Sequence, residues 1–492
     1  MMPGVTEPTA DATPPAAATA DPLDLRATAP AAPAPPEAVP VEEGTPAQKL
    51  AWVLYDWANS GYGLIFGGPL FTTVFIAKLL PEQPGWPRDS SLSADAIVTG
   101  VTILGRPLGG DSFLALLVAL VALLTCLGAP VLGALADLRG WQKGLFIAFT
   151  LVGSLLAMSA AVLIPGDGGG RWAVAAVLYV ASMFCFSMSN TYYNAFLPRL
   201  TAPDRQGRLS GWGFAVGYVG GAVALIFAGL VLPKLGWGIG LMLAVGGLWW
   251  LIFSIPAFLL LPRIPAAPAS LAALPGASAA STVLLGPFRR VFSTLKHLRR
   301  YRMLFLFLLA FLLYTNGTET IIYLSPAFGT RVLGMAEASL TTMFLIVQFV
   351  AFAGAVACGY LADRIGNKPV ILGTLAIWVA GVFATYFVKT PLQFTLMGCV
   401  IGLVLGGVQS SSRALMSRLT PDGMRNEAFG FYAVGSKAMA ILGPLLYAGI
   451  SAVAGPREAV FAVLPFLAIG MLLLLPVREP RTGTGVATDF TD

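Results

Sequence analysis

A carboxylate lies in an otherwise apolar stretch near the start of the chain, AWVLYDWANSGYGLIF (residues 51–66). On a helix, Asp56, Asn59 and Ser60 fall at positions i, i+3 and i+4, so they share one polar stripe. A charge inside a membrane-compatible helix is costly, and the stripe should face protein or a water-filled path. One interpretation is that the stripe lines a path for a polar solute. The alternative is that Asp56 forms a structural ion pair near the membrane edge.

Composition indicates that lipid is the solvent for most of the chain. Hydrophobic residues make up 57% and charged residues 11% of the 492 positions, whereas about 25% of residues are charged in soluble domains. The one histidine, His297, excludes a multi-histidine metal site, and the four cysteines lie in separate apolar runs without metal-ligand spacing. Because no nucleophile is placed with a base, we predict that the protein is not an enzyme, and we expect no metal, no other cofactor and no nucleic acid.

Twelve apolar segments are long enough to cross a bilayer as helices, which takes about 20 residues. They are residues 49–79, 113–136, 143–164, 172–197, 210–232, 239–261, 302–324, 339–361, 368–388, 392–413, 428–450 and 457–476. Twelve spans put both termini on one side. Twenty-one of the 30 lysine and arginine residues fall on that side and eight on the other, which predicts that both termini are cytoplasmic.

The chain divides around a linker in its middle. The expected parts are a disordered acidic Ala/Pro-rich tail (1–46), an amino-terminal six-helix bundle (47–262), a cytoplasmic linker (263–300), a carboxy-terminal six-helix bundle (301–478) and a tail (479–492). In the linker, apolar and basic residues interleave at helical spacing. This pattern predicts an amphipathic basic helix lying on anionic lipid at the inner membrane surface.

The two bundles repeat one another in sequence. The run AFLPRLT (195–201) matches ALMSRLT (414–420) 219 positions later, and GALADLRG (133–140) matches GYLADRIG (359–366) 226 positions later. Repeated bundles are typical of transporters, with the substrate path at their interface. The predicted fold is therefore an all-α membrane protein with twelve transmembrane helices in two pseudo-symmetric six-helix bundles.

Polar side chains recur on the first and fourth span of each half. The candidates for substrate binding or coupling are Asp56, Asn59, Tyr55, Asn190, Tyr193, Asn194, Asn316, Glu319, Gln409, Arg413 and Lys437. Glu319 is the candidate proton carrier because desolvation disfavours a charged carboxylate; the alternative is a satisfied polar residue near the outer mouth. An unpaired lysine at mid-bilayer costs about 3 kcal/mol, so Lys437 should pair with Asp56, with Glu319 or with a substrate carboxylate, unless its ion pair is only structural. For Arg413 the alternative is extension to lipid headgroups.

Two acidic turns end the second and eighth spans. Asp137 with Arg139, and Asp363 with Arg364, lie beside glycines at these helix ends. A carboxylate in such a turn caps a neighbouring helix N-terminus or pairs with a base across the halves. We therefore predict a gating latch on the inner face, without substrate contact.

These turns resemble the loop motif of the major facilitator superfamily. The runs YDWANS (55–60), GGVQSSSR (406–413) and GFY (430–432), the last followed by Lys437, resemble the vacuole effluxer-like branch of that superfamily, whose fungal members are associated with amino-acid release from the vacuole. The resemblance implies a secondary transporter with contacts at Asp56, Asn59, Gln409, Arg413 and Lys437. Span seven departs from the branch, since it reads TNGTE (315–319) in place of an Asn-Asp-Gly-x-Gln-like run.

The predicted function is secondary active transport of a small polar solute, preferably an amino acid, by alternating access. A zwitterion would turn its carboxylate toward Lys437 or Arg413 and its ammonium group toward Asp56 or Glu319. Coupling to protons is favoured over sodium because Glu319 is a candidate titrating acid. The alternatives are export of drugs or metabolites, and a non-transporting scaffold or sensor. We expect a monomer in a bacterial inner (plasma) membrane, with a small-molecule substrate, protons and membrane lipids as partners.

Overall fold

The computed structural model describes residues 43–67, 71, 75–83, 99–103, 105–164, 171–266, 301–421, 423–438, 450 and 457–480. Three expectations lie outside the described residues: the disorder of the acidic tail up to residue 42, the amphipathic helix of the linker, and the tail from residue 481 onward.

The amino-terminal half begins with a helix that is capped by its own sequence. The Thr45 side chain accepts a hydrogen bond from the backbone N–H of Gln48 (3.3 Å), the Gln48 side chain accepts one from the N–H of Thr45 (2.9 Å), and Pro46 suits the first helical position. The helices of this half are α1 (Pro46–Ile65), α3 (Gly110–Arg139), α4 (Gln142–Met158), α5 (Ala160–Leu163), α6 (Trp172–Asn194), α7 (Leu197–Leu200), α8 (Gln206–Ile226), α9 (Leu232–Lys234) and α10 (Ile239–Leu260), with π-helical turns at Phe75–Leu79 and Phe227–Val231 and a 3₁₀ turn at Pro203–Arg205.

One helix of the carboxy-terminal half begins with the same kind of cap as α1. In front of α16, Thr390 and Gln393 form the reciprocal cap around Pro391. The helices of this half are α13 (Arg302–Arg331), α14 (Glu337–Ile365), α15 (Asn367–Phe387), α16 (Pro391–Leu419), α17 (Arg425–Ala438), a 3₁₀ helix (Glu458–Val463) and α19 (Leu464–Leu474).

A short hairpin before α3 is an element that the sequence analysis did not predict. Strand β1 (Gly100–Ile103) pairs antiparallel with β2 (Arg106–Gly109). Gly105 lies in the turn with a φ of 75°, a conformation that favours glycine. Strands of four residues carry too few alternating positions to be recognised in a segment rich in glycine and proline.

Nine helices in the described part of the chain are long and apolar enough to cross a membrane, and each coincides with one of the predicted spans. The helices run further than hydropathy indicated. For example, α13 continues to Arg331 and α16 to Leu419, because the polar ends of helices read as loops on a hydropathy scale.

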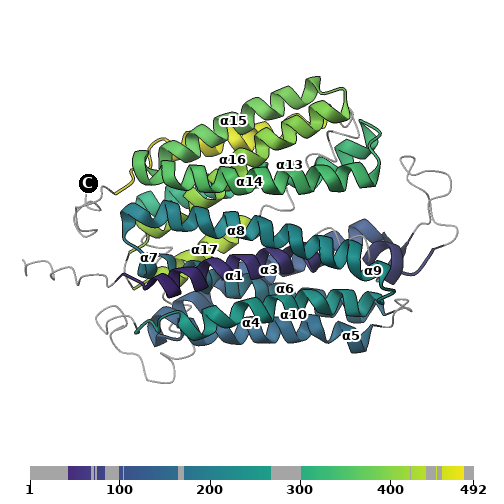
Figure 1. Ribbon diagram of the computed structural model, residues 1–492, viewed down its shortest axis with the longest axis horizontal. Helices are drawn as coiled ribbons and strands as arrows, with labels where there is room; N and C mark the ends of the chain where they lie inside the picture. The colour runs from purple at the N-terminus through teal and green to yellow at the C-terminus, as the bar shows by residue number, and fades with distance from the viewer. Residues whose placement is uncertain are drawn as a thin grey trace, which may run out of the picture. The chain divides into compact units, whose positions relative to one another are not determined.

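Among the described helices, two pairs make the most extensive contacts between the halves, and the internal repeat relates one pair to the other. Helix α3 packs against α17, and α8 packs against α14 (Figure 1). These are predicted spans two with eleven and five with eight. The contacts between the halves therefore follow the pseudo-symmetry of the sequence.

The first and the last described residues of the chain lie at one end of the bundle, called here the termini end. Gly44 donates a backbone hydrogen bond to the carbonyl that ends α7 (3.1 Å), and Glu479 contacts Asn367 at the start of α15. Between them, the start of α8 meets the end of α14 through Arg208 and Asp363.

Candidate functional site between the two halves

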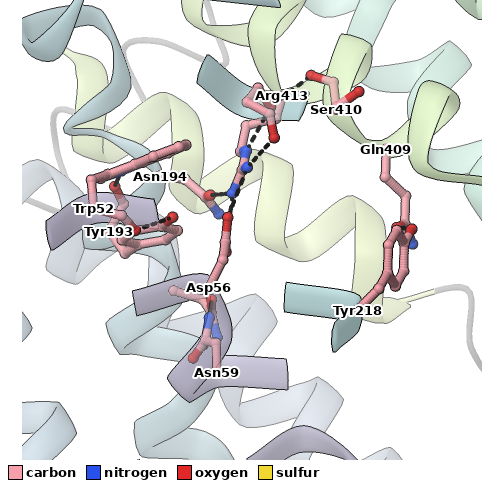
Figure 2. A network of polar contacts seen from close by, with 11 residues as sticks. Trp52, Asp56, Asn59, Tyr193, Asn194, Tyr218, Gln409, Ser410 and Arg413 are labelled. Carbon is pink, nitrogen blue, oxygen red and sulfur yellow. Dashed lines mark hydrogen bonds and ion pairs between the residues drawn. The ribbon is translucent and has the colours of Figure 1, made fainter. Parts of the chain in front are cut away.

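A buried ion pair joins α1 of the amino-terminal half to α16 of the carboxy-terminal half. Nη2 of Arg413 donates to Oδ2 of Asp56 (2.9 Å), and Nη1 donates to Oδ1 (3.3 Å) (Figure 2). Only 7% of Asp56 and 2% of Arg413 are exposed. Two parallel hydrogen bonds make this the strong, planar form of the arginine–carboxylate interaction.

The remaining donors of Arg413 are also satisfied. Nε donates to the Ser210 hydroxyl (2.9 Å), Nη2 donates to the Ser210 carbonyl (2.9 Å), and Nη1 donates to Oδ1 of Asn194 (3.4 Å). Asn194 is the residue that the internal repeat aligns with Arg413, 219 positions later. Since residues related by a two-fold axis meet only near that axis, the guanidinium lies close to the pseudo-symmetry axis between the halves.

Aromatic rings enclose the same guanidinium. Cζ of Arg413 lies 4.3 Å from the ring centroid of Phe214, 4.5 Å from that of Trp52 and 5.8 Å from that of Tyr193. Ring faces attract a cation and thereby offset part of the cost of burying it. The alternative in which Arg413 extends to lipid headgroups is wrong for this structure, because the side chain is buried between the halves.

Glycines on α8 make room for the ion pair. A Cβ atom at Gly213 would meet Oδ2 of Asp56 and would lie 2.7 Å from Nη2 of Arg413, and one at Gly217 would lie 2.7 Å from the Ser60 hydroxyl. The sequence analysis assigned no role to these glycines. Their spacing of four residues is the signal that indicates a face on which another helix packs closely.

A second polar contact between the halves lies one helical turn from the ion pair. The Tyr218 hydroxyl on α8 donates to Oε1 of Gln409 on α16 (2.6 Å), and the Ser210 hydroxyl donates to the Ser410 carbonyl (2.9 Å) (Figure 2). Tyr218 and Gln409 are half-buried. The polar stripe of α16 therefore faces α8, a helix from which the sequence analysis took no site residue.

Three predicted residues on α1 and α6 bond within the amino-terminal half. The side-chain amide of Asn59 donates to Asn190. The Tyr193 hydroxyl donates to the Trp52 carbonyl (2.9 Å), which orients two of the rings around Arg413. These contacts support the site from one side.

Tyr55 lies in the core of its own half and not at the interface. Its fully buried hydroxyl contacts the Ser189 hydroxyl (2.7 Å) and accepts from Nε1 of Trp250 (3.3 Å). Its ring packs on Tyr193, with centroids 4.5 Å apart. Tyr55 therefore supports the site through Tyr193 and does not face the other half.

The predicted residues on α13 lie further from the termini end. Counted at about 1.5 Å per residue, Arg413 lies about 9 Å from the end of α16, and Glu319 about 26 Å from the start of α13. Glu319 is exposed and lies within electrostatic range of Tyr218 and Tyr432, while Asn316 is buried. The side chain of Lys437 lies outside the described residues, and its predicted pairing stays a prediction.

The two acidic turns cap helices of the opposite half. Asp137 at the end of α3 accepts hydrogen bonds from the backbone N–H groups of Asn426 (3.2 Å) and Glu427 (3.0 Å) at the start of α17. Asp363 at the end of α14 accepts from the N–H of Arg208 at the start of α8 (3.2 Å to each oxygen). The caps are reciprocal, since each half supplies one carboxylate and receives one.

Glycines bring the backbones together beside both caps. A Cβ at Gly133 would meet the backbone of Asn426, and one at Gly359 would lie 2.9 Å from the carbonyl oxygen of Gly207. The halves are therefore closed against each other at the termini end. Arg139 lies over the ring of Trp141 (5.7 Å) and the Arg364 side chain is exposed, so neither predicted base is part of these caps.

No group of three His, Cys, Asp or Glu side chains that could hold a metal ion occurs in the described part of the chain. Among the described residues, the site consists of hydrogen-bonding groups, the Asp56 carboxylate, the Arg413 guanidinium and aromatic rings. Such groups can bind and release a polar solute.

Relatives of the chain are known in bacteria and fungi. Residues 45–484 match the family described as "Vacuole effluxer Atg22 like". The MFS-type transporter YxiO of Bacillus subtilis (strain 168) is 28% identical over 458 residues, covering 90% of this chain and 98% of YxiO. Autophagy-related protein 22 of Coccidioides immitis (strain RS) is 24% identical over 534 residues, covering 89% of this chain and 87% of that protein.

Solved structures share the fold. The proton:xylose symporter XylE of the major facilitator superfamily superposes with a TM-score of 0.64 at 15% identity, covering 89% of this chain and 97% of XylE. A bacterial homologue of the iron transporter ferroportin, in an outward-facing state with soaked iron, gives 0.59 at 16% identity, covering 87% and 97%. At such identities the likeness concerns the fold alone, and it confirms the predicted major facilitator fold.

Proposed function

Since the chain belongs to the vacuole effluxer Atg22-like family of MFS-type transporters, we propose that it carries amino acids across the membrane by alternating access. The observation that supports the proposal is the buried pair of Asp56 and Arg413, in which one acid and one base from opposite halves meet near the pseudo-symmetry axis. A substrate bound there would touch both halves at once, as a solute carried between two bundles must.

A zwitterion complements this pair in charge. When the halves separate, the ion pair between Asp56 and Arg413 breaks. Leaving a buried charge without a partner costs several kcal/mol of free energy. The ammonium group of an amino acid replaces Arg413 beside Asp56, and its carboxylate replaces Asp56 beside Arg413. The bound substrate thus lowers the free energy of the conformational change that carries it across the membrane. An uncharged sugar would leave both charges unpaired.

The reciprocal caps at Asp137 and Asp363 act as the gate of the proposed cycle. Both caps lie at the termini end. We propose that this end faces the cytoplasm, because most lysine and arginine residues are predicted on that side, and that the structure is a state closed toward the cytoplasm. Opening toward that side breaks both caps together, because each cap crosses from one half to the other.

Glu319 is the proposed proton carrier. It is exposed beyond the ion pair, close to Tyr218 and Tyr432, so a proton from the outer side reaches it while the termini end is closed. XylE, which has the same fold, is described as a proton symporter. We further propose that the protein works as a monomer in a bacterial inner (plasma) membrane; the MFS-type relative from Bacillus subtilis supports a bacterial source.

Counterflow in proteoliposomes tests the substrate class. Vesicles loaded with an unlabelled compound are diluted into the same compound in radiolabelled form, with amino acids, sugars and lipophilic cations tested in turn. We expect transient accumulation of labelled amino acids alone. Accumulation of lipophilic cations without amino acids would identify a drug exporter and contradict the proposal.

A further inference from the structure

In the carboxy-terminal half, the chain supplies a carboxylate to the start of α15. Glu479 accepts hydrogen bonds from the backbone N–H groups of Asn367 and Lys368 (3.1 Å each), and Nη1 of Arg418 donates to it (2.6 Å). Beside it, Nζ of Lys368 donates to the carbonyl of Leu475 at the end of α19 (2.6 Å). This helix start therefore binds an anionic group.

The amino-terminal half repeats the arrangement without the acid. Lys143 at the start of α4 donates to the carbonyl of Leu261 at the end of α10, as Lys368 does in the other half. The segments that follow read LLPRIP (260–265) and LLPVREP (474–480). With one residue inserted in the second segment, Arg263 aligns with Arg478, and the position of Glu479 is taken by Ile264 in the first half.

A cavity of about 440 Å³ lies beside the start of α4, lined by Trp141, Lys143, Gly144, Ile147, Phe258 and Arg263 among others. Lys143 and Arg263 lie close enough for their charges to repel. In the part of the chain that the structure describes, neither cation is paired with a carboxylate. Helix α4 also begins without a side-chain cap, so its first N–H groups add to the positive potential.

We propose that this cavity binds the headgroup of an anionic phospholipid, whose phosphate interacts with the start of α4 as the Glu479 carboxylate interacts with the start of α15. None of the residues that line the cavity belongs to the Asp56–Arg413 site, so lipid binding there does not depend on which substrate is transported.

The location of the cavity and its lining residues favour a lipid over a soluble anion as the ligand. The membrane-spanning segments Gln142–Leu163 and Ile239–Leu260 both end at the cavity, which places it at headgroup level. Gly144 and Ile147 share one face of α4 with Leu151 and Leu155, of which 37% and 56% are exposed. An acyl chain can follow this face, and Trp141, 50% exposed, is the residue type that favours the interface. Figure 1 shows α4 beside α10.

The test compares equivalent arginines of the two halves. The full chain is placed in phosphatidylcholine nanodiscs with increasing phosphatidylglycerol, and the melting temperature and the bound phosphatidylglycerol seen by native mass spectrometry are recorded. We expect Arg263→Gln to weaken phosphatidylglycerol binding about fivefold, because this is the contribution of one basic residue to binding at an anionic membrane surface. Arg478→Gln, the matched control beside Glu479, should bind like wild type, and Arg263→Lys should restore binding.

Two results would overturn the proposal. If Arg263→Gln and Arg478→Gln weakened phosphatidylglycerol binding equally, the lipid would be attracted by the overall positive charge of the surface and not by this cavity. A second contrary result would come from inorganic phosphate added in detergent. If phosphate raised the melting temperature as much as phosphatidylglycerol does, and Arg263→Gln removed this rise, the cavity would be a site for free anions. Arg263→Glu, which puts a carboxylate of the chain into the cavity, should remove the response to phosphatidylglycerol while leaving the protein folded, because Arg263 is exposed.

Discussion

Asp56 and Arg413 form a bidentate ion pair across the two halves, with both side chains buried and every N–H group of the guanidinium directed at an acceptor or enclosed by aromatic rings. A buried pair of this kind adds little stability compared with apolar residues of similar size, but losing one partner is costly. The pair is therefore suited to hold a state that a charged substrate can release.

Asp56→Asn should lower the free energy of unfolding by about 3–5 kcal/mol, because it leaves the Arg413 charge buried and unpaired. Arg413→Gln should cost a similar amount. The double variant should cost clearly less than the sum of the two, since it leaves no unpaired charge. Unfolding in detergent measures all three, and strictly additive losses would mean that the two charges do not interact.

Gly213→Ala should abolish most transport while leaving the protein folded. The added methyl group would lie 2.7 Å from Nη2 of Arg413 and would collide with Asp56, so the ion pair must shift. Gly373→Ala is the control, because no atom lies within 4 Å of a Cβ at that helical position. Uptake is measured in proteoliposomes, and equal activity of the two variants would disprove the need for close packing of α8 on the pair.

Asp137→Asn and Asp363→Asn should each open the termini end, since an amide is a weaker acceptor than a carboxylate for the N–H groups of a helix start. Spin labels at Arg205 and Ile365, both exposed and in different halves, report the opening as a longer distance by pulsed electron paramagnetic resonance, after removal of the four native cysteines. Glu458→Gln, in the 3₁₀ helix before α19, is the control. Unchanged distances in the two Asp variants would exclude a gating role.

Glu319→Gln should leave counterflow intact and abolish accumulation driven by a proton gradient. An amide cannot carry a proton, while exchange of substrate needs only the conformational change. Accumulation is followed at several pH values beside Glu82→Gln, which alters an exposed acid before the hairpin. If Glu319→Gln retains both accumulation and its pH dependence, Glu319 is not the proton carrier.

Sequence alone identified both members of the ion pair but not their partnership. Asp56 and Arg413 were recognisable as charges in apolar helices, whereas distances along separate helices do not show which side chains reach each other. Ser210 and Phe214 gave no signal, because a serine and a phenylalanine are ordinary residues in a membrane span. The predicted gating residues behave in two ways. Asp137 and Asp363 accept hydrogen bonds from the opposite half, whereas Arg139 contacts a residue of its own half.

The repeat was readable in sequence, but its most informative difference was not. Glu479 was expected to start a tail, since one acid after an apolar run looks like the beginning of a polar terminus. The structure shows it bound to Asn367 and Arg418. Only that contact reveals that the equivalent place beside Lys143 lacks an anion.

Counterflow by the double variant Asp56→Asn with Arg413→Gln tests the role of the buried ion pair in transport. This variant removes both charges together, so the protein should stay folded, as its unfolding curve in detergent will show. We expect the folded double-variant protein to exchange no amino acid that the wild-type chain exchanges. Counterflow at the wild-type rate would contradict this expectation, because the buried pair would then serve packing alone.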